Sequence, residues 1–174
     1  MHRPFVAIAR RVGVGAAFFY AAACTGSSPV DPPRACTLIG CEDGLKVDLA
    51  PSSGWPTGAY QMTLLVDDVR VVCRGSLPLP PCATRAISCE PAGVVTIAES
   101  GCALPAASQG FAQIAFDSRL RPKRVEVSIT RDEVAVAQAA FTPVFERVFP
   151  NGPDCPPGCD VARRRIDVAP MPLD

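Results

Sequence analysis

Cysteine is the residue type that offers this sequence the most chemistry. The 174-residue chain contains nine cysteines. A cysteine can act as a nucleophile, bind a metal or form a disulfide, depending on its pKa and on the redox compartment. Because nine is an odd number, at least one cysteine has no partner within the chain. Cys24 stands apart from the others, directly after an apolar stretch.

The first 23 residues predict a signal peptide. Arg3, Arg10 and Arg11 give a positively charged start, and residues 12–23 carry no charge. A membrane-spanning helix needs roughly 18 or more apolar residues, so this run is too short for one. Its length is typical of the apolar region of a signal peptide, about 7–15 residues. The sequence therefore predicts an exported protein.

Three alanines, at positions 21–23, immediately precede Cys24. This arrangement resembles the lipobox of bacterial lipoproteins, although Ala21 stands where that family usually has leucine. The resemblance implies that the chain is cleaved before Cys24 and that Cys24 carries the lipid that anchors the protein to a membrane of the cell envelope. A secreted protein without lipid is the alternative. Residues 24–35, which are rich in proline, serine and glycine, predict a flexible tether.

The only histidine, His2, lies in the predicted signal peptide. Without it, the mature chain cannot form a Ser-His-Asp or Cys-His nucleophile or a histidine-containing zinc site. Cleavage also removes three of the seventeen basic residues and none of the seventeen acidic ones, which leaves a net charge of −3 and disfavours nucleic acid as a partner. The adjacent carboxylates at 42–43 and 67–68 are interpreted as turn residues. We therefore predict no enzyme, no catalytic residue, no cofactor and no metal site.

The eight other cysteines predict four disulfides, since an exported chain meets an oxidising environment. They are Cys36, Cys41, Cys73, Cys82, Cys89, Cys102, Cys155 and Cys159. Eight cysteines allow 105 pairings. We expect Cys73 to pair with Cys82 and Cys89 with Cys102, and the first two cysteines to pair with the last two across the termini. Local pairs, Cys36 with Cys41 and Cys155 with Cys159, are the alternative.

Hydrophobic residues alternate with polar ones over several short segments. This period of two, typical of half-buried strands, occurs at residues 45–49, 60–64, 112–116, 125–129 and 134–136, with turn residues between them. Residues 143–149 also favour a strand. No segment shows helical periodicity. The pattern predicts an all-β fold, an antiparallel β-sandwich, over residues 36–160, followed by a C-terminal tail at 161–174.

The sequence also resembles small cysteine-rich bacterial lipoproteins with an immunoglobulin-like β-sandwich. The stretches that carry this resemblance are G-C-E-D-G-L, G-A-Y before a long strand, the strand that ends at Cys73, and P-N-G-P-D-C-P-P-G-C. The resemblance implies a fold and a location in the envelope. It supplies no functional site, because most of those lipoproteins have no known function.

Three residues are candidates for binding a partner. Trp55, the only tryptophan, lies in a Gly/Pro-rich loop, where it either contacts a partner or covers one end of the sandwich. Leu77 and Leu79 lie in the loop that a Cys73–Cys82 disulfide would close. We therefore expect a lipid-anchored binding or structural module without catalytic activity, whose partner is a protein or a glycan. The alternative is an inhibitor of secreted hydrolases that acts through the Cys73–Cys82 loop, because a rigid loop binds at a lower entropic cost.

Overall fold

The computed structural model describes residues 36–169, except residues 38 and 41. The described residues belong to one compact unit. The predicted signal peptide, the tether, Cys24 and Cys41 lie outside the described residues. Within the described part of the chain, no helix is long and apolar enough to cross a membrane.

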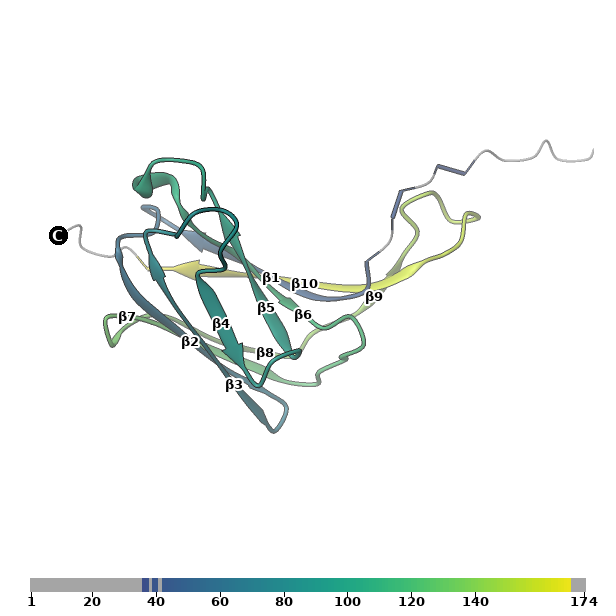
Figure 1. Ribbon diagram of the computed structural model, residues 1–174. Coiled ribbons are helices and arrows are strands. Elements are labelled where there is room, and N and C mark those ends of the chain that lie inside the picture. Colours follow the sequence, from purple (N-terminus) through teal and green to yellow (C-terminus); the bar gives the residue numbers. More distant parts are fainter. Residues whose placement is uncertain (1–35, 38, 41, 170–174) are drawn as a thin grey trace, which may run out of the picture. The chain divides into compact units, whose positions relative to one another are not determined.

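Two five-stranded sheets face each other (Figure 1). The first sheet has the order β5 (Val95–Ser100), β6 (Gly110–Phe116), β1 (Gly44–Pro51), β10 (Cys159–Val168) and β9 (Glu146–Val148). The second has the order β4 (Ile87–Glu90), β3 (Val69–Leu77), β2 (Gly58–Val66), β7 (Val125–Arg131) and β8 (Val134–Phe141). The described chain contains one short 3₁₀ turn, Ala106–Ser108. The expected all-β sandwich is confirmed.

The inward residues of the alternating strands form one hydrophobic core between the sheets. The central strand β2 shows the pattern most clearly, since Tyr60, Met62 and Leu64 are buried while Gln61 and Thr63 are only partly so. Alternation arises because successive side chains in a strand point to opposite faces of the sheet. Each strand thus contributes one apolar row to the core and one row to the outer face.

A β-bulge in β6 turns one residue, Ala112, away from the core. Ala112 was expected to be buried, but it is exposed, whereas Phe111 is buried. The pairing between β5 and β6 shifts where Ala98 lies opposite Gln113 and Glu99 lies opposite Phe111. Ala112 is therefore the extra residue of the bulge, and the alternation restarts on the other side of it.

The predicted boundary at residue 160 is wrong. Residues 161–168 belong to β10, which pairs in parallel with β1 from Gly44 opposite Val161 to Pro51 opposite Val168. This segment contains the run Arg163–Arg164–Arg165. Arg163 and Arg165 point outward, and the guanidinium of Arg164 lies over the ring of Phe141 at 5.7 Å. The sandwich therefore extends to Val168, with one parallel pair in an otherwise antiparallel fold.

The disulfides differ in part from those expected. Cys36 pairs with Cys155, so the expected bridge across the termini is confirmed and the local alternative is wrong for these two residues. The pairs Cys73–Cys82 and Cys89–Cys102 are wrong, because the structure pairs Cys73 with Cys89 and Cys82 with Cys102.

The physical reason for the correct pairing lies in the sheet register. Cys73 in β3 stands directly opposite Cys89 in β4. This register brings their Cα atoms to 3.9 Å from each other, so the two sulfur atoms can meet. Cys159 is also disulfide-bonded. Cys155 and Cys159 are therefore both disulfide-bonded, as expected for cysteines of an exported chain.

Candidate functional site

The three residues predicted to bind a partner are all buried. Trp55 is 7% exposed, Leu77 3% and Leu79 8%. Leu77 ends β3 on its inner face, and the backbone N–H of Leu79 donates a hydrogen bond to Oε1 of Gln109 at 2.6 Å. These side chains therefore contribute to the core and present no surface to a partner.

Trp55 covers one end of the sandwich, which was the second of its two interpretations. Its ring makes edge contacts with Tyr60 and Phe111, with ring centroids 5.4 and 5.3 Å apart, and these two rings also contact each other at 5.4 Å. The hydroxyl of Tyr60 donates to the carbonyl of Pro56 at 2.7 Å. Burial raises the pKa of Tyr60 to about 12, because the protein interior disfavours the phenolate.

The prediction of an inhibitory loop closed by a Cys73–Cys82 disulfide is also wrong. No disulfide joins Cys73 to Cys82, and residues 74–77 continue β3. The loop therefore has neither the closure nor the exposed leucines that the inhibitor hypothesis needed.

The paired carboxylates hold turns together. Asp67, between β2 and β3, accepts hydrogen bonds from the backbone N–H groups of Lys123 and Arg124 at 2.8 and 2.9 Å. Asp43 accepts one from the backbone N–H of Asp160 at 2.7 Å. Within the described residues, no three histidine, cysteine, aspartate or glutamate side chains come together as a metal site.

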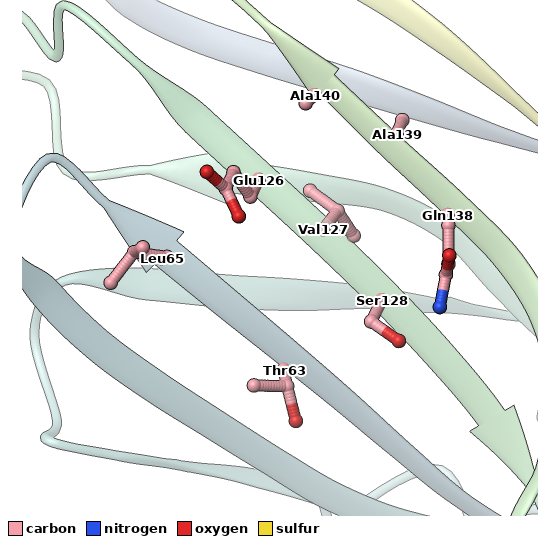
Figure 2. A pocket seen from close by; sticks show the side chains of 8 residues that line it. All are labelled: Thr63, Leu65, Glu126, Val127, Ser128, Gln138, Ala139 and Ala140. Atoms are coloured by element: carbon pink, nitrogen blue, oxygen red, sulfur yellow. The ribbon is translucent and has the colours of Figure 1, made fainter.

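The outer face of the second sheet presents a different set of residues. Strand β2 contributes Thr63 and Leu65, β7 contributes Glu126 and Ser128, and β8 contributes Gln138 and Ala140. The register places Thr63, Ser128 and Gln138 in one row across three strands, and Leu65, Glu126 and Ala140 in the next. Figure 2 shows both rows. Together they line a shallow hollow of about 430 Å³.

A second hollow lies beside the first residues of β2, and a third lies at the end of the sandwich near Trp55. The second, about 420 Å³, is lined by Ala59, Tyr60, Gln61, Arg74, Gly75, Thr130, Asp132 and Glu133. The third, about 670 Å³, is lined by Ser53, Trp55, Pro56, Thr57, Ala106, Ala107, Arg131 and Asp132. Asp132 borders both of them, and Gln61 donates a hydrogen bond to the neighbouring Thr63 of the first hollow at 3.5 Å. We call the first two hollows together the β2 groove.

Charged side chains in and beside the β2 groove form three pairs with charged or polar partners. Arg124 pairs with Glu126 at 2.8 Å, and Arg131 lies 3.3 Å from Asp132. Arg74 donates to Oε1 of Gln61 at 3.0 Å. Its other polar groups are the carboxylate of Glu133 and the neutral hydroxyls and amides of threonine, serine and glutamine. The groove therefore offers many hydrogen bonds without a strong electric field of one sign.

The sequence contains the signal for these residues, but it was interpreted only in terms of the core. In the segments 60–64 and 125–129, the polar residues that alternate with core residues line the β2 groove. A polar residue in a half-buried strand normally faces water and has no other role. Only the packing of the three strands shows that these residues form one concave surface.

No protein family model matches the chain, and neither the curated proteins nor the solved structures include a significant match.

Proposed function

We propose that the protein is a non-catalytic binding module of the bacterial cell envelope, held at a membrane by lipid on Cys24. The observation that carries the proposal is that all seven described cysteines are disulfide-bonded. Disulfides persist in exported proteins and are rare in the cytosol. Export agrees with the leader-like residues 1–23, and the three small residues before Cys24 agree with lipidation.

The β2 groove supplies the binding surface of this proposal. Its side chains project from the adjacent strands β2, β7 and β8, and β2 and β7 are each paired on both sides. Side chains on such strands are held in place before a ligand arrives, which lowers the entropic cost of binding. The groove is also the outer face of the sheet, so a ligand reaches it without any change in the core.

The anchor is tested by the intact mass and the location of the full chain in a bacterial host that processes lipoproteins. We expect cleavage before Cys24, added lipid and no thiol that reacts with an alkylating reagent under denaturing conditions. Cys24→Ser is expected to move the protein out of the membrane fraction, whereas Ser28→Ala in the same segment is not. A wild-type chain without lipid, or with free thiols, would contradict this part of the proposal.

The binding role is tested with isolated cell walls from which lipid has been removed. The detergent-solubilised full chain is expected to sediment with them, and Thr63→Arg, which fills the groove, is expected to reduce the bound fraction by about tenfold. Thr96→Arg is the matched control, because Thr96 is an exposed strand residue of the other sheet. Equal binding by both variants would exclude the β2 groove as the binding surface.

A further inference from the structure

Exposed apolar side chains gather at one hairpin of the described chain. Strand β9 pairs with the first residues of β10, and we call residues 144–161 the β9–β10 hairpin. Three exposed large hydrophobic residues belong to it, namely Val144, Val148 and Phe149, with exposed fractions of 68%, 40% and 40%. A fourth, Ile39, is 56% exposed. Single exposed apolar residues are normal on a protein surface, whereas several in one place mark a contact with a partner or a membrane.

The start of the described chain is fastened to this hairpin. Cys36 forms a disulfide with Cys155 in the loop that joins the two strands. The side chain of Asn151 accepts a hydrogen bond from the backbone N–H of Ile39 at 2.9 Å and donates one to the carbonyl of Ile39 at 3.1 Å. Asn151 follows Phe149 by two residues, so Ile39 adds its side chain to the apolar surface of the hairpin.

The ring of Phe149 is held in place and half presented. A Cβ atom at Gly158 would lie 2.7 Å from Cε1 of Phe149, so the ring packs against this glycine on the other arm of the hairpin. The guanidinium of Arg147 lies over the ring at 5.9 Å and pairs with Asp160 at 3.1 Å. An apolar ring beside a long amphipathic side chain whose charge is paired suits the boundary between lipid headgroups and acyl chains.

The hairpin also lies at the end of the domain from which the anchor leads. Cys36 follows Cys24 by twelve residues, so even a fully extended chain between them spans only about 40 Å. The hairpin precedes Val161 of β10, whereas Trp55 follows Pro51 of β1. These two strands run parallel along eight paired positions, so the hairpin and Trp55 lie at opposite ends of a strand pair about 23 Å long.

We propose that the β9–β10 hairpin rests on the lipid surface of the membrane that holds the anchor, with Phe149 and Ile39 at the level between headgroups and acyl chains. This inference rests on the proposed lipid anchor at Cys24 and names the surface that the anchored end contacts. The anchor keeps the hairpin close to the bilayer, so the contact forms even if the hairpin alone binds lipid weakly. The end of the sandwich that contains Trp55 then faces away from the membrane.

Tryptophan probes in the lipidated full chain test the inference. Each variant is reconstituted in phosphatidylcholine vesicles with and without bromine on the acyl chains, since bromine quenches only those tryptophans that reach it. Ile39→Trp and Phe149→Trp place a probe on the hairpin, and bromine should lower the fluorescence of each probe by about twofold. The fluorescence of the wild type, which comes from Trp55 alone, should not change.

Leu104→Trp is the matched control. Leu104 is 55% exposed, nearly as much as Ile39, and lies in the segment that leads to Gly110, which packs against Trp55. Its probe should remain unquenched. Phe149→Asp, combined with Ile39→Trp, should restore the fluorescence of the Ile39 probe, because a carboxylate is excluded from the acyl chains. Thermal unfolding shows which variants fold, and Ile39→Trp remains informative if Phe149→Trp does not.

Two results would overturn the inference: unquenched probes at the hairpin, or equal quenching of the hairpin probes and of the Leu104 probe. The intact mass of the same preparation separates this failure from failure of the anchor. If Cys24 carries lipid and the hairpin probes stay unquenched, the hairpin contact is wrong and the proposed anchor stands. If Cys24 carries no lipid, the anchor is wrong and the hairpin contact is rejected with it.

Discussion

Gly110, the first residue of β6, lies against the indole ring of Trp55. A Cβ atom at this position would lie 2.8 Å from Cγ and from Nε1 of that ring. Both residues are buried, and Trp55 is held in place by Tyr60 and Phe111. The glycine is therefore required by close packing at the end of the sandwich.

The first prediction is that Gly110→Ala destabilises the protein by about 1–3 kcal/mol, because the added methyl group forces the aromatic cluster apart. Denaturation with urea measures the change. Gly40→Ala is the control, since a Cβ at Gly40 meets no atom within 4 Å, and it should change the stability little. Equal stability of the two variants would mean that the contact between Gly110 and Trp55 is looser than described.

Tyr60 makes the stability depend on pH in the alkaline range. Its pKa rises from 10.0 to about 12 on folding, chiefly because burial disfavours the phenolate. Between these two values the unfolded chain releases a proton that the folded chain keeps. The stability contribution of the neutral hydroxyl is therefore complete below about pH 10 and is lost as the pH rises towards 12.

The second prediction is that the free energy of unfolding falls between pH 10 and 12 by up to about 1.4 kcal/mol per pH unit on account of Tyr60. Urea denaturation at several pH values measures the slope. Tyr60→Phe loses the hydrogen bond to Pro56 and is less stable at neutral pH, but its slope should be shallower. Identical slopes for both proteins would contradict the assignment.

Gln109 is the buried polar side chain of the described core. It accepts from the N–H of Leu79 and donates to the carbonyl of Leu104 at 2.9 Å. It thereby satisfies two backbone groups in segments that have no strand partner there. Leu79 can be buried because the Gln109 side chain replaces the sheet hydrogen bond that its N–H lacks, whereas Leu104 is 55% exposed.

At the scale of the elements, two disulfides each join segments that lie close together in the sequence. Cys73–Cys89 joins β3 to the four-residue strand β4, and Cys82–Cys102 joins the loops that precede β4 and follow β5. Their sequence separations are 16 and 20 residues. In the chain-entropy description these separations differ in effect by only about 0.2 kcal/mol. Which of the two disulfides stabilises the protein more therefore depends on how deeply the cysteine side chains are buried.

The third prediction follows from that burial. Cys73 is fully buried in the core, whereas Cys82 is exposed. Replacing Cys73 and Cys89 by alanine should cost about 1 kcal/mol more than replacing Cys82 and Cys102, because it also removes core contacts. Denaturation of the two double variants compares them. A larger loss for the exposed pair would show that loop constraint outweighs packing.

At the scale of the whole molecule, the first and last long strands of the described chain lie side by side. Strand β1 is central in its sheet because β10 pairs with it along eight positions on one side and β6 on the other. The backbone N–H of Ala169, just after β10, donates to the carbonyl of Val136 in the opposite sheet at 3.0 Å. The end of the chain thus links the two sheets.

The fourth prediction is that a chain ending at Asp160 does not fold cooperatively. Removing the part of β10 after Asp160 exposes one side of β1 and takes the buried residues Ala162, Ile166 and Val168 out of the core. A chain ending at Ala169 keeps every described strand and should unfold with a midpoint close to that of the full chain. Thermal unfolding followed by near-ultraviolet circular dichroism distinguishes them, and a sharp transition in the shorter chain would refute the role of β10.

The local properties of this protein follow from its sequence. Alternation at residues 45–49, 60–64 and 125–129 predicted strands and their buried faces, because side-chain direction in a strand depends only on position along it. The leader-like first 23 residues and the even set of cysteines after Cys24 predicted an exported, disulfide-bonded chain. Disulfide bonding is confirmed for the seven described cysteines, although two of the expected pairs are wrong.

Only the tertiary structure decided which distant segments meet. The partner of Cys73 depends on the register of β3 against β4, and the place of residues 161–168 depends on a strand more than a hundred residues earlier in the chain. Trp55, Leu77 and Leu79 looked available in sequence, yet packing buries all three. The β2 groove exists because three strands place their polar rows side by side. Such contacts depend on how the strands assemble in space, which the residue pattern of a single strand does not encode.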